Sequence, residues 1–260
     1  MRLGQLEIEV PEKWRGCRPG HEVVLLAESV EVTPGERVAE LGSGVGALAL
    51  ALAARVAVEV VGFEIQPGLV EIARRNADLN AHLLRGCVRF ETNDIRRLGG
   101  TKWEGKFDHV VANPPFYRAG QGRRSPQPAR AMARHEIEAT LEDFARAAAI
   151  LLRQRGRFHC IFRPERLEDL LAVASRHRCP IKTIRPIYTR EGAAAEWAIV
   201  AAVKGGRPGL VISPPQLVRQ LVYSPKSKVQ GLGASPEIGR RSSLRKLFLV
   251  VFDPEGIKRE

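Results

Sequence analysis

The residues best suited to chemistry form the run Asn113-Pro114-Pro115-Phe116, which directly follows an apolar segment over 108–112 that predicts a buried strand. An asparagine offers a hydrogen-bond acceptor, two prolines stiffen the backbone, and an aromatic ring provides a stacking face. An amine conjugated to a ring is a poor nucleophile because its lone pair is delocalised, and acceptors aimed at its N–H bonds favour the more nucleophilic, pyramidal form. We therefore predict that Asn113, Pro114 and Phe116 hold a planar amine for reaction.

The elements that position this run begin with a second motif upstream. A short strand predicted over 36–41 leads into Gly42-Ser43-Gly44-Val45-Gly46, and an Ala/Leu-rich helix follows over 47–55. Strand, glycine turn and helix form the first unit of a doubly wound α/β sheet, in which helix amides face a ligand. Gly42, Gly44 and Ala47 fit the dinucleotide pattern G-x-G-x-x-A. From Glu40 onward the same run equally fits E-x-G-x-G-x-G, the adenosylmethionine-binding pattern, so the motif alone leaves both ligands open.

Two acidic residues follow the next two predicted strands. Glu64 ends a β-rich run over 57–63 and is placed to accept hydrogen bonds from ribose hydroxyls. Asp94 lies after a strand over 87–91, on the same edge of the sheet, where it can accept a hydrogen bond from an adenine amino group. Each has a plainer reading, a surface residue at a strand end for Glu64 and an Asx turn or helix N-cap for Asp94.

The remaining pattern extends this unit into one sheet. Further helices are predicted over 21–32, 67–80, 135–153 and 164–177, with a fifth strand over 157–162. Two late strands, over 180–188 and 195–203, have no helix between them and predict an antiparallel hairpin at the sheet edge. The fold class is therefore α/β and Rossmann-like, with a seven-stranded, mostly parallel sheet and an antiparallel C-terminal hairpin. We expect residues 1–212 to form this domain, with 1–33 as its N-terminal loop and helix, and 213–260 to form a basic C-terminal extension.

Composition narrows the class of partner. The 260 residues carry a net charge of +12, with 44% hydrophobic and 27% charged residues, as in a soluble globular protein. No apolar run is long enough for a membrane span, and the N-terminus lacks the apolar core of a signal peptide. The four cysteines are scattered without a C-x-x-C pair, which favours reduced thiols in a cytoplasmic protein and no metal site.

Basic residues gather beside the candidate amine site and near the C-terminus. The stretch 118–134 contains no acid and five arginines: Arg118, Arg123, Arg124, Arg130 and Arg134. Residues 213–247 carry seven basic residues against the single acid Glu237. We expect the five arginines to contact phosphates, so that a nucleic acid is the predicted partner.

These motifs together resemble the class I, S-adenosylmethionine-dependent amino-methyltransferases that carry an N-P-P-[YF] motif. Within that group the chain is similar to the bacterial tRNA(Val) (adenine-37-N6)-methyltransferase family. The runs that carry the resemblance are Gly20–Ala27, Glu40–Gly46, Asn113–Tyr117, Arg134–Glu136, Arg157–Phe158 with Arg163–Leu167, and Lys204–Gly209, of which the later ones are the more family-specific. Phe116 stands where tyrosine is common, and the basic segment after residue 212 is longer than the family pattern suggests.

The resemblance implies a role for each matching position. Glu40, Gly42 and Gly44 would line the methionine portion of S-adenosylmethionine, with Glu64 on its ribose and Asp94 on its adenine. Asn113 would lie beside both the cofactor and the target base, and S-adenosylhomocysteine would be the product. The implied reaction is methylation of the N6 amine of an adenine in RNA, most of all tRNA.

Other functions stay open from the sequence. The N-P-P motif also suits a glutamine side-chain amide in a translation protein, or an adenine in DNA. A nucleotide-dependent oxidoreductase fits the glycine turn and leaves Asn113-Pro114-Pro115-Phe116 unexplained, and a non-catalytic RNA-binding module would not need Asn113. A monomer and a homodimer are equally compatible with the sequence.

Overall fold

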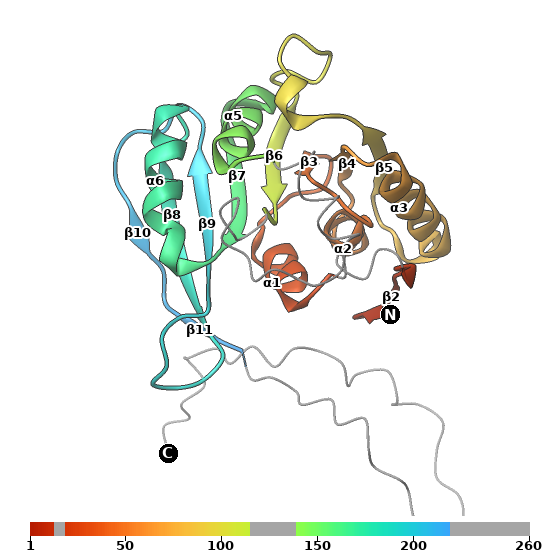
Figure 1. The fold of residues 1–260 in the computed structure, drawn as a ribbon, viewed down its shortest axis with the longest axis horizontal. Coiled ribbons are helices and arrows are strands. Elements are labelled where there is room, and N and C mark those ends of the chain that lie inside the picture. Colours follow the sequence, from red (N-terminus) through yellow and green to blue (C-terminus); the bar gives the residue numbers. More distant parts are fainter. Residues whose placement is uncertain (13–18, 115–138, 219–260) are drawn as a thin grey trace, which may run out of the picture.

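A single sheet with helices on both faces forms the centre of the protein (Figure 1). The computed structural model describes residues 1–12, 19–114 and 139–218. Strands lie in the order β10-β8-β9-β7-β6-β3-β4-β5, and β11 also pairs with β8. The predicted Rossmann-like α/β class is confirmed.

Five parallel strands form the larger part of the sheet. They are β3 (Arg37–Leu41), β4 (Glu59–Glu64), β5 (Cys87–Thr92), β6 (Phe107–Ala112) and β7 (Leu152–Phe162). Most of their residues are buried, as expected for strands covered on both faces. The order reverses at β3, because the chain builds β4 and β5 on one side of it and β6 and β7 on the other.

The predicted antiparallel hairpin is present next to β7. Strand β9 (Trp197–Val203) pairs antiparallel with both β7 and β8 (Ile181–Tyr188). The second strand of the hairpin, β9, therefore lies between β7 and the first strand, β8. The predicted number of seven strands is wrong, because β10 (Val211–Ile212) and β11 (Gln216–Leu217) add two short parallel pairings to β8. Strands of two residues are too short to show an alternating pattern, so they could not be predicted from the sequence.

Two groups of helices cover the two faces of the sheet. Helices α1 (His21–Ser29), α2 (Ala47–Arg55) and α3 (Pro67–Leu79) share one hydrophobic cluster. Helices α5 (Leu141–Leu151) and α6 (Leu167–Arg176) share the other. Short 3₁₀ turns lie at Ala81–Leu83, Ile95–Arg97 and Pro164–Arg166.

Helix α5 ends earlier than the sequence suggested. The predicted end at Arg153 is wrong, because α5 ends at Leu151 and β7 begins at once with Leu152, ahead of the predicted strand start at 157. Gly156 lies inside β7, where the register with β6 shifts, and Arg155 before it has a φ of 67°. The apolar spacing up to Leu152 fits a helix equally well, so only pairing with β6 fixes the boundary.

The N-terminal hairpin is held to α3 by buried amides. Strands β1 (Arg2–Leu3) and β2 (Leu6–Glu7) form an antiparallel pair. The Asn76 and Asn80 side-chain oxygens accept hydrogen bonds from the backbone N–H groups of Glu9 and Glu7 at 2.8 and 2.9 Å. These hydrogen bonds satisfy backbone N–H groups that lose their bonds to water when the hairpin packs against the helix.

A histidine pair is buried within the sheet, between β6 and β7. The His109 Nδ1 atom lies 3.0 Å from the His159 Nε2 atom, and the His109 Nε2 atom lies 3.2 Å from a Glu36 carboxylate oxygen. Burial lowers the pKa of His159 to about 3, with the neighbouring His109 and Arg157 adding to the shift. Both rings are therefore neutral at physiological pH, and the pair forms a neutral hydrogen-bonded link between β6 and β7.

Candidate active site

The candidate residues converge where the parallel strands end. In the register of the sheet, Leu41 on β3 lies opposite Phe63 on β4 and opposite Ala112 on β6. Gly42, Glu64 and Asn113 come next on each strand and therefore lie at one level. This is also the point at which the strand order reverses, where open α/β sheets bind their ligands.

The glycine turn has a backbone that favours glycine. Gly42, Gly44 and Gly46 have φ values of 69°, 53° and 83°, which side-chain-bearing residues adopt at a cost. A Cβ atom on Gly44 would meet no heavy atom within 4 Å, whereas one on Gly46 would lie 2.6 Å from the Phe90 ring. Gly46 therefore serves packing between α2 and β5, and Gly44 leaves open space at the start of α2.

Two buried carboxyl groups lie beside this turn. Glu64 accepts hydrogen bonds from the backbone N–H groups of Gly44 and Gln66, both at 3.0 Å, and Glu40 accepts one from Ala49 at 3.0 Å. Burial raises the pKa of Glu64, and burial followed by the nearby charge of Glu64 raises the pKa of Glu40 well above its usual range. Among the described residues neither forms an ion pair with Lys or Arg, so both favour an electropositive ligand.

Asn113 presents an acceptor that nothing in the described structure occupies. Its side-chain oxygen is buried, and it has no hydrogen-bond partner within the described ranges. Pro114 behind it is buried, which holds this backbone in place. A buried acceptor without a partner costs about 1–3 kcal/mol, and such groups persist at sites where a ligand satisfies them.

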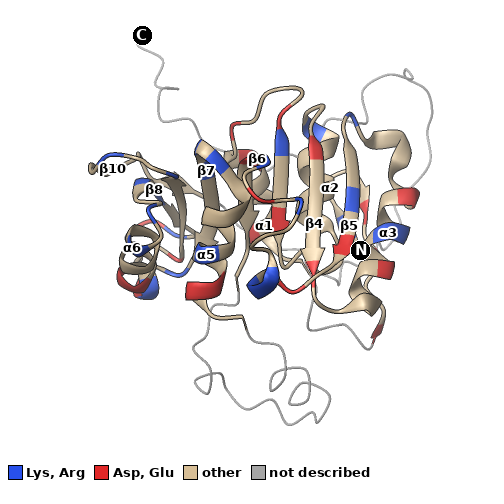
Figure 2. Ribbon diagram, turned by 90° about the horizontal axis from the view of Figure 1, so that it is seen from above, with Lys and Arg blue, Asp and Glu red and all other residues tan. Residues whose placement is uncertain are grey.

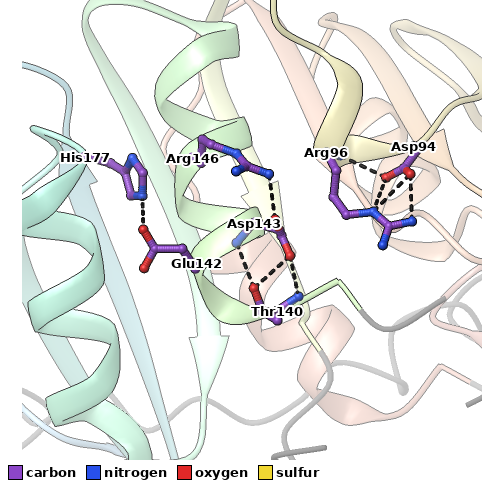
Figure 3. Close-up of polar contacts among 7 residues, drawn as sticks. All are labelled: Asp94, Arg96, Thr140, Glu142, Asp143, Arg146 and His177. Carbon is purple, nitrogen blue, oxygen red and sulfur yellow. Dashed lines mark hydrogen bonds and ion pairs between the residues drawn. The ribbon is translucent and has the colours of Figure 1, made fainter. Parts of the chain in front are cut away.

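Asp94 is the N-cap of a short helical turn, which is one of the two roles that the sequence left open. Its carboxylate accepts hydrogen bonds from the Arg96 backbone N–H at 2.9 Å and from the Arg96 guanidinium at 2.7–3.0 Å, and it caps the 3₁₀ turn Ile95–Arg97 (Figure 3). The hydrogen bonds to Arg96 lower the pKa of Asp94. An ionised carboxylate has further acceptor capacity, so a contact with adenine stays a prediction.

Helix α5 begins next to this corner of the site. Thr140 and Asp143 form a capping box, in which the Thr140 side-chain oxygen accepts from the Asp143 N–H at 3.2 Å and the Asp143 carboxylate accepts from the Thr140 N–H at 2.9 Å (Figure 3). The hydrogen bonds to Asp94 raise the pKa of Arg96, and the negative charge of Asp143 adds to this shift. With Thr140 as its N-cap, α5 begins at Leu141, and the predicted helix start at 135 lies outside the described residues.

Several predicted residues lie outside the described part of the chain. They are Phe116 and the arginines at 118, 123, 124, 130 and 134. Ser43 was not among the predicted site residues, yet its buried hydroxyl is also without a partner among the described residues. A serine inside a glycine turn gives no signal that separates this case from an exposed loop serine.

The described ranges contain neither a metal-binding cluster nor a membrane-spanning helix. No group of three or more His, Cys, Asp or Glu side chains there is arranged to hold a metal ion. None of the helices in those ranges combines the length and apolar character needed to cross a membrane.

The arrangement fits S-adenosylmethionine. Its ammonium and ribose hydroxyls are donors, which suits the unpaired carboxyls of Glu40 and Glu64, and Gly44 leaves room for close approach. The sheet order, the glycine turn and these two carboxyls define the protein as a class I, S-adenosylmethionine-dependent methyltransferase.

Comparison with known proteins identifies the family to which the chain belongs. A family model described as methyltransferase small domain matches residues 23–165, more than half of the chain. A relative from Porphyromonas gingivalis is 34% identical over 184 residues, which cover 67% of this chain and 70% of the relative. A relative from Tolumonas auensis is 31% identical over 174 residues, which cover 64% and 70%. Both carry the name tRNA1(Val) (adenine(37)-N6)-methyltransferase.

The solved structures agree on the fold. A predicted O-methyltransferase, protein Atu636 from Agrobacterium tumefaciens, superposes with a TM-score of 0.60 at 25% identity, over 78% of this chain and 92% of that one. The chain belongs to the methyltransferase small domain family, together with these two curated relatives. It is an S-adenosylmethionine-dependent N-methyltransferase, which removes the oxidoreductase alternative left open by the glycine turn.

Proposed function

We propose that this enzyme methylates the N6 amine of an adenine in tRNA, with the adenosine beside the anticodon of a valine tRNA as its target. The observation that carries the reaction type is the buried, unpaired side-chain oxygen of Asn113 at the end of β6. The names of the two curated relatives support the adenine and the tRNA.

The cofactor would be held by the glycine turn and the two buried carboxyls. Glu40, Gly42 and Gly44 would line its methionine portion, Glu64 would accept from its ribose hydroxyls, and Asp94 would contact its adenine. S-adenosylmethionine, when bound, supplies an electrophilic methyl group. The level shared by Gly42 and Asn113 on adjacent strands supports an arrangement in which donor and acceptor face each other.

The protein's own contribution to the reaction is to position and activate the amine. The Asn113 side-chain oxygen and the Pro114 carbonyl would accept from its two N–H bonds, which concentrates the lone pair on nitrogen. Phe116 would stack on the base, worth roughly 1–3 kcal/mol. No dedicated base is needed, because the amine loses its proton after the bond to carbon forms.

An RNA substrate would be held mainly through its phosphates. The arginines at 118, 123, 124, 130 and 134 follow the N-P-P motif directly in the sequence and are the candidates for this contact. A base in an anticodon loop must leave its stack to reach Phe116. A tRNA substrate also implies a cytoplasmic location, and residues 213–260 would act as a basic extension of the 1–212 domain.

The test is methyl transfer from labelled S-adenosylmethionine to separate pools of tRNA, rRNA, DNA and protein. We expect label in tRNA, recovered as N6-methyladenosine after nuclease digestion. A valine tRNA transcript in which guanosine replaces the adenosine beside the anticodon is the matched control and should stay unlabelled. Label confined to glutamine in a protein would contradict the proposal and favour the amide alternative.

A further inference from the structure

A basic surface lies at the edge of the sheet opposite the candidate active site. Three turns meet there: one at the start of β7, one before β8 and one after β9. Six basic residues lie on or next to these turns: Arg155, Arg157, Arg178, Lys182, Lys204 and Arg207. We call this set the opposite-edge patch. Lys and Arg positions appear as blue segments near the labels of β7, β8 and β10 in Figure 2.

Backbone hydrogen bonds join the three turns into one surface. The Arg155 N–H donates to the Lys204 carbonyl at 3.2 Å, and the Gly205 N–H donates to the Arg178 carbonyl at 2.7 Å. The Lys182 ammonium group donates to the Arg207 carbonyl at 2.9 Å. The backbones that carry the positive charges are therefore held together, although they come from segments far apart in the sequence.

The patch carries charge that the protein does not neutralise. Within the described ranges, none of its six side chains forms an ion pair with an acidic residue. Nearby acids are engaged by other arginines, Asp108 by Arg153 and Glu142 by Arg176. Arg155, Arg157, Arg178 and Arg207 are exposed. A surface of one sign, without internal partners, attracts a polyanion.

The backbone gives a second, independent indication. Arg155 and Arg178, with φ values of 67° and 55°, are the two non-glycine residues with positive φ in the described part of the chain. Glycine or asparagine adopts this conformation more easily than arginine. Strained backbone is typically kept where function requires the side chain, and both strained positions here carry an arginine on the same patch.

The patch is too far from Asn113 to touch the target base. Arg157 lies opposite His109 on β6, and Asn113 is four residues further along that strand, roughly 13 Å away at the rise of a strand. The turns that carry Arg155 and Arg178 lie further still from that end of the strand. A ligand that reaches both places must therefore be long, as a folded RNA is.

We propose that the opposite-edge patch binds the phosphate backbone of the substrate RNA outside the loop that carries the target base. This inference rests on the proposed function and adds a second contact to it. The patch reads no sequence, since phosphate contacts set position and affinity, and it favours a whole tRNA over a short fragment.

The test compares two double variants that each lose two positive charges. Arg155→Gly/Arg178→Gly removes two patch charges and also relieves the strained backbone. Arg75→Gln/Arg85→Gln is the control for loss of charge alone, because both residues are exposed and lie on and after α3, away from the patch; Arg75, unlike the patch arginines, pairs with Glu9 at 3.8 Å. Affinity for full-length tRNA is measured as a function of salt, together with kcat and KM on the tRNA and on a short anticodon stem-loop.

We expect the patch variant to lose affinity for tRNA by about tenfold at 0.15 M salt, with the salt slope falling by roughly 1.5, since each lost contact removes about 0.7–0.9. Its KM on tRNA should rise while kcat and the stem-loop KM stay unchanged, and its melting temperature should be equal or higher. The control should keep the parent slope and KM. A merely destabilising change would not give a variant that is more stable and yet binds RNA less well.

Three outcomes would overturn the inference. They are an unchanged tRNA slope in the patch variant, an equal loss in the control, and a loss seen only in binding to vesicles of anionic lipid. Each can be recognised while methyl transfer to the stem-loop proceeds normally. The proposed function itself fails in a different way, when neither RNA is methylated.

Discussion

Replacing Asn113 by alanine should separate catalysis from stability. The Asn113 side-chain oxygen is buried and has no partner in the described structure, so the ligand-free protein bears its desolvation cost of about 1–3 kcal/mol. Asn113→Ala removes that cost together with some packing. We therefore expect the free energy of unfolding to change by no more than about 1 kcal/mol, a much smaller loss than typical core truncations give.

The effect on the reaction should be large. An acceptor placed at the reacting group contributes about 2.7–4 kcal/mol when it acts like a preorganised hydrogen-bond partner, so kcat should fall by roughly 10²–10³. The dissociation constant for S-adenosylmethionine should change much less, because Glu40, Glu64 and the glycine turn stay in place. The measurements are kcat at saturating cofactor, cofactor titration by calorimetry, and the urea midpoint.

Ser43 provides a matched control for this experiment. Its hydroxyl is also buried without a partner in the described ranges, and its Cβ atom lies against Gly62 on the neighbouring strand. Ser43→Ala should relieve a similar desolvation cost and keep kcat within about threefold. The reasoning about the amine acceptor would be refuted if Asn113→Ala kept kcat within that range. A fall in kcat matched by an equal loss of stability would refute it as well.

Two further predictions concern packing and pH. A Cβ at Gly46 would meet Phe90 at 2.6 Å, so Gly46→Ala should cost about 2–4 kcal/mol in urea unfolding. Gly44→Ala, with open space around it, should cost about 1 kcal/mol and instead weaken cofactor binding; equal stability losses would contradict this assignment. His159 has a folded pKa of about 3, below its unfolded value, so the unfolded chain binds more protons below about pH 6.5. Stability should fall by about 2 kcal/mol on going to pH 5. His159→Gln should remove that part of the fall, whereas parallel pH curves for the two proteins would show that His159 does not cause it.

The sequence by itself predicted which residues meet at one edge of the sheet and the order in which they occur along the chain. The glycine turn, Glu64 and Asn113 each follow an apolar run, and parallel strands bring their carboxyl ends to one edge, so their convergence could be inferred without coordinates. The resemblance carried by the N-P-P motif then gave the family correctly. Apolar runs were sufficient here, because parallel strands buried on both faces are nearly continuous stretches of apolar residues.

Only the tertiary structure decided the features that depend on distant segments. The helix expected up to Arg153 became strand from Leu152 onward, since pairing with β6 outweighs local preference. The buried oxygen of Asn113 and the raised pKa of Glu40 follow from what packs around them, which spacing does not show. The opposite-edge patch arises because turns near 155, 178 and 205 hydrogen-bond to one another across the sheet. Charges separated by more than twenty positions become one surface through strand pairing, which no local sequence window contains.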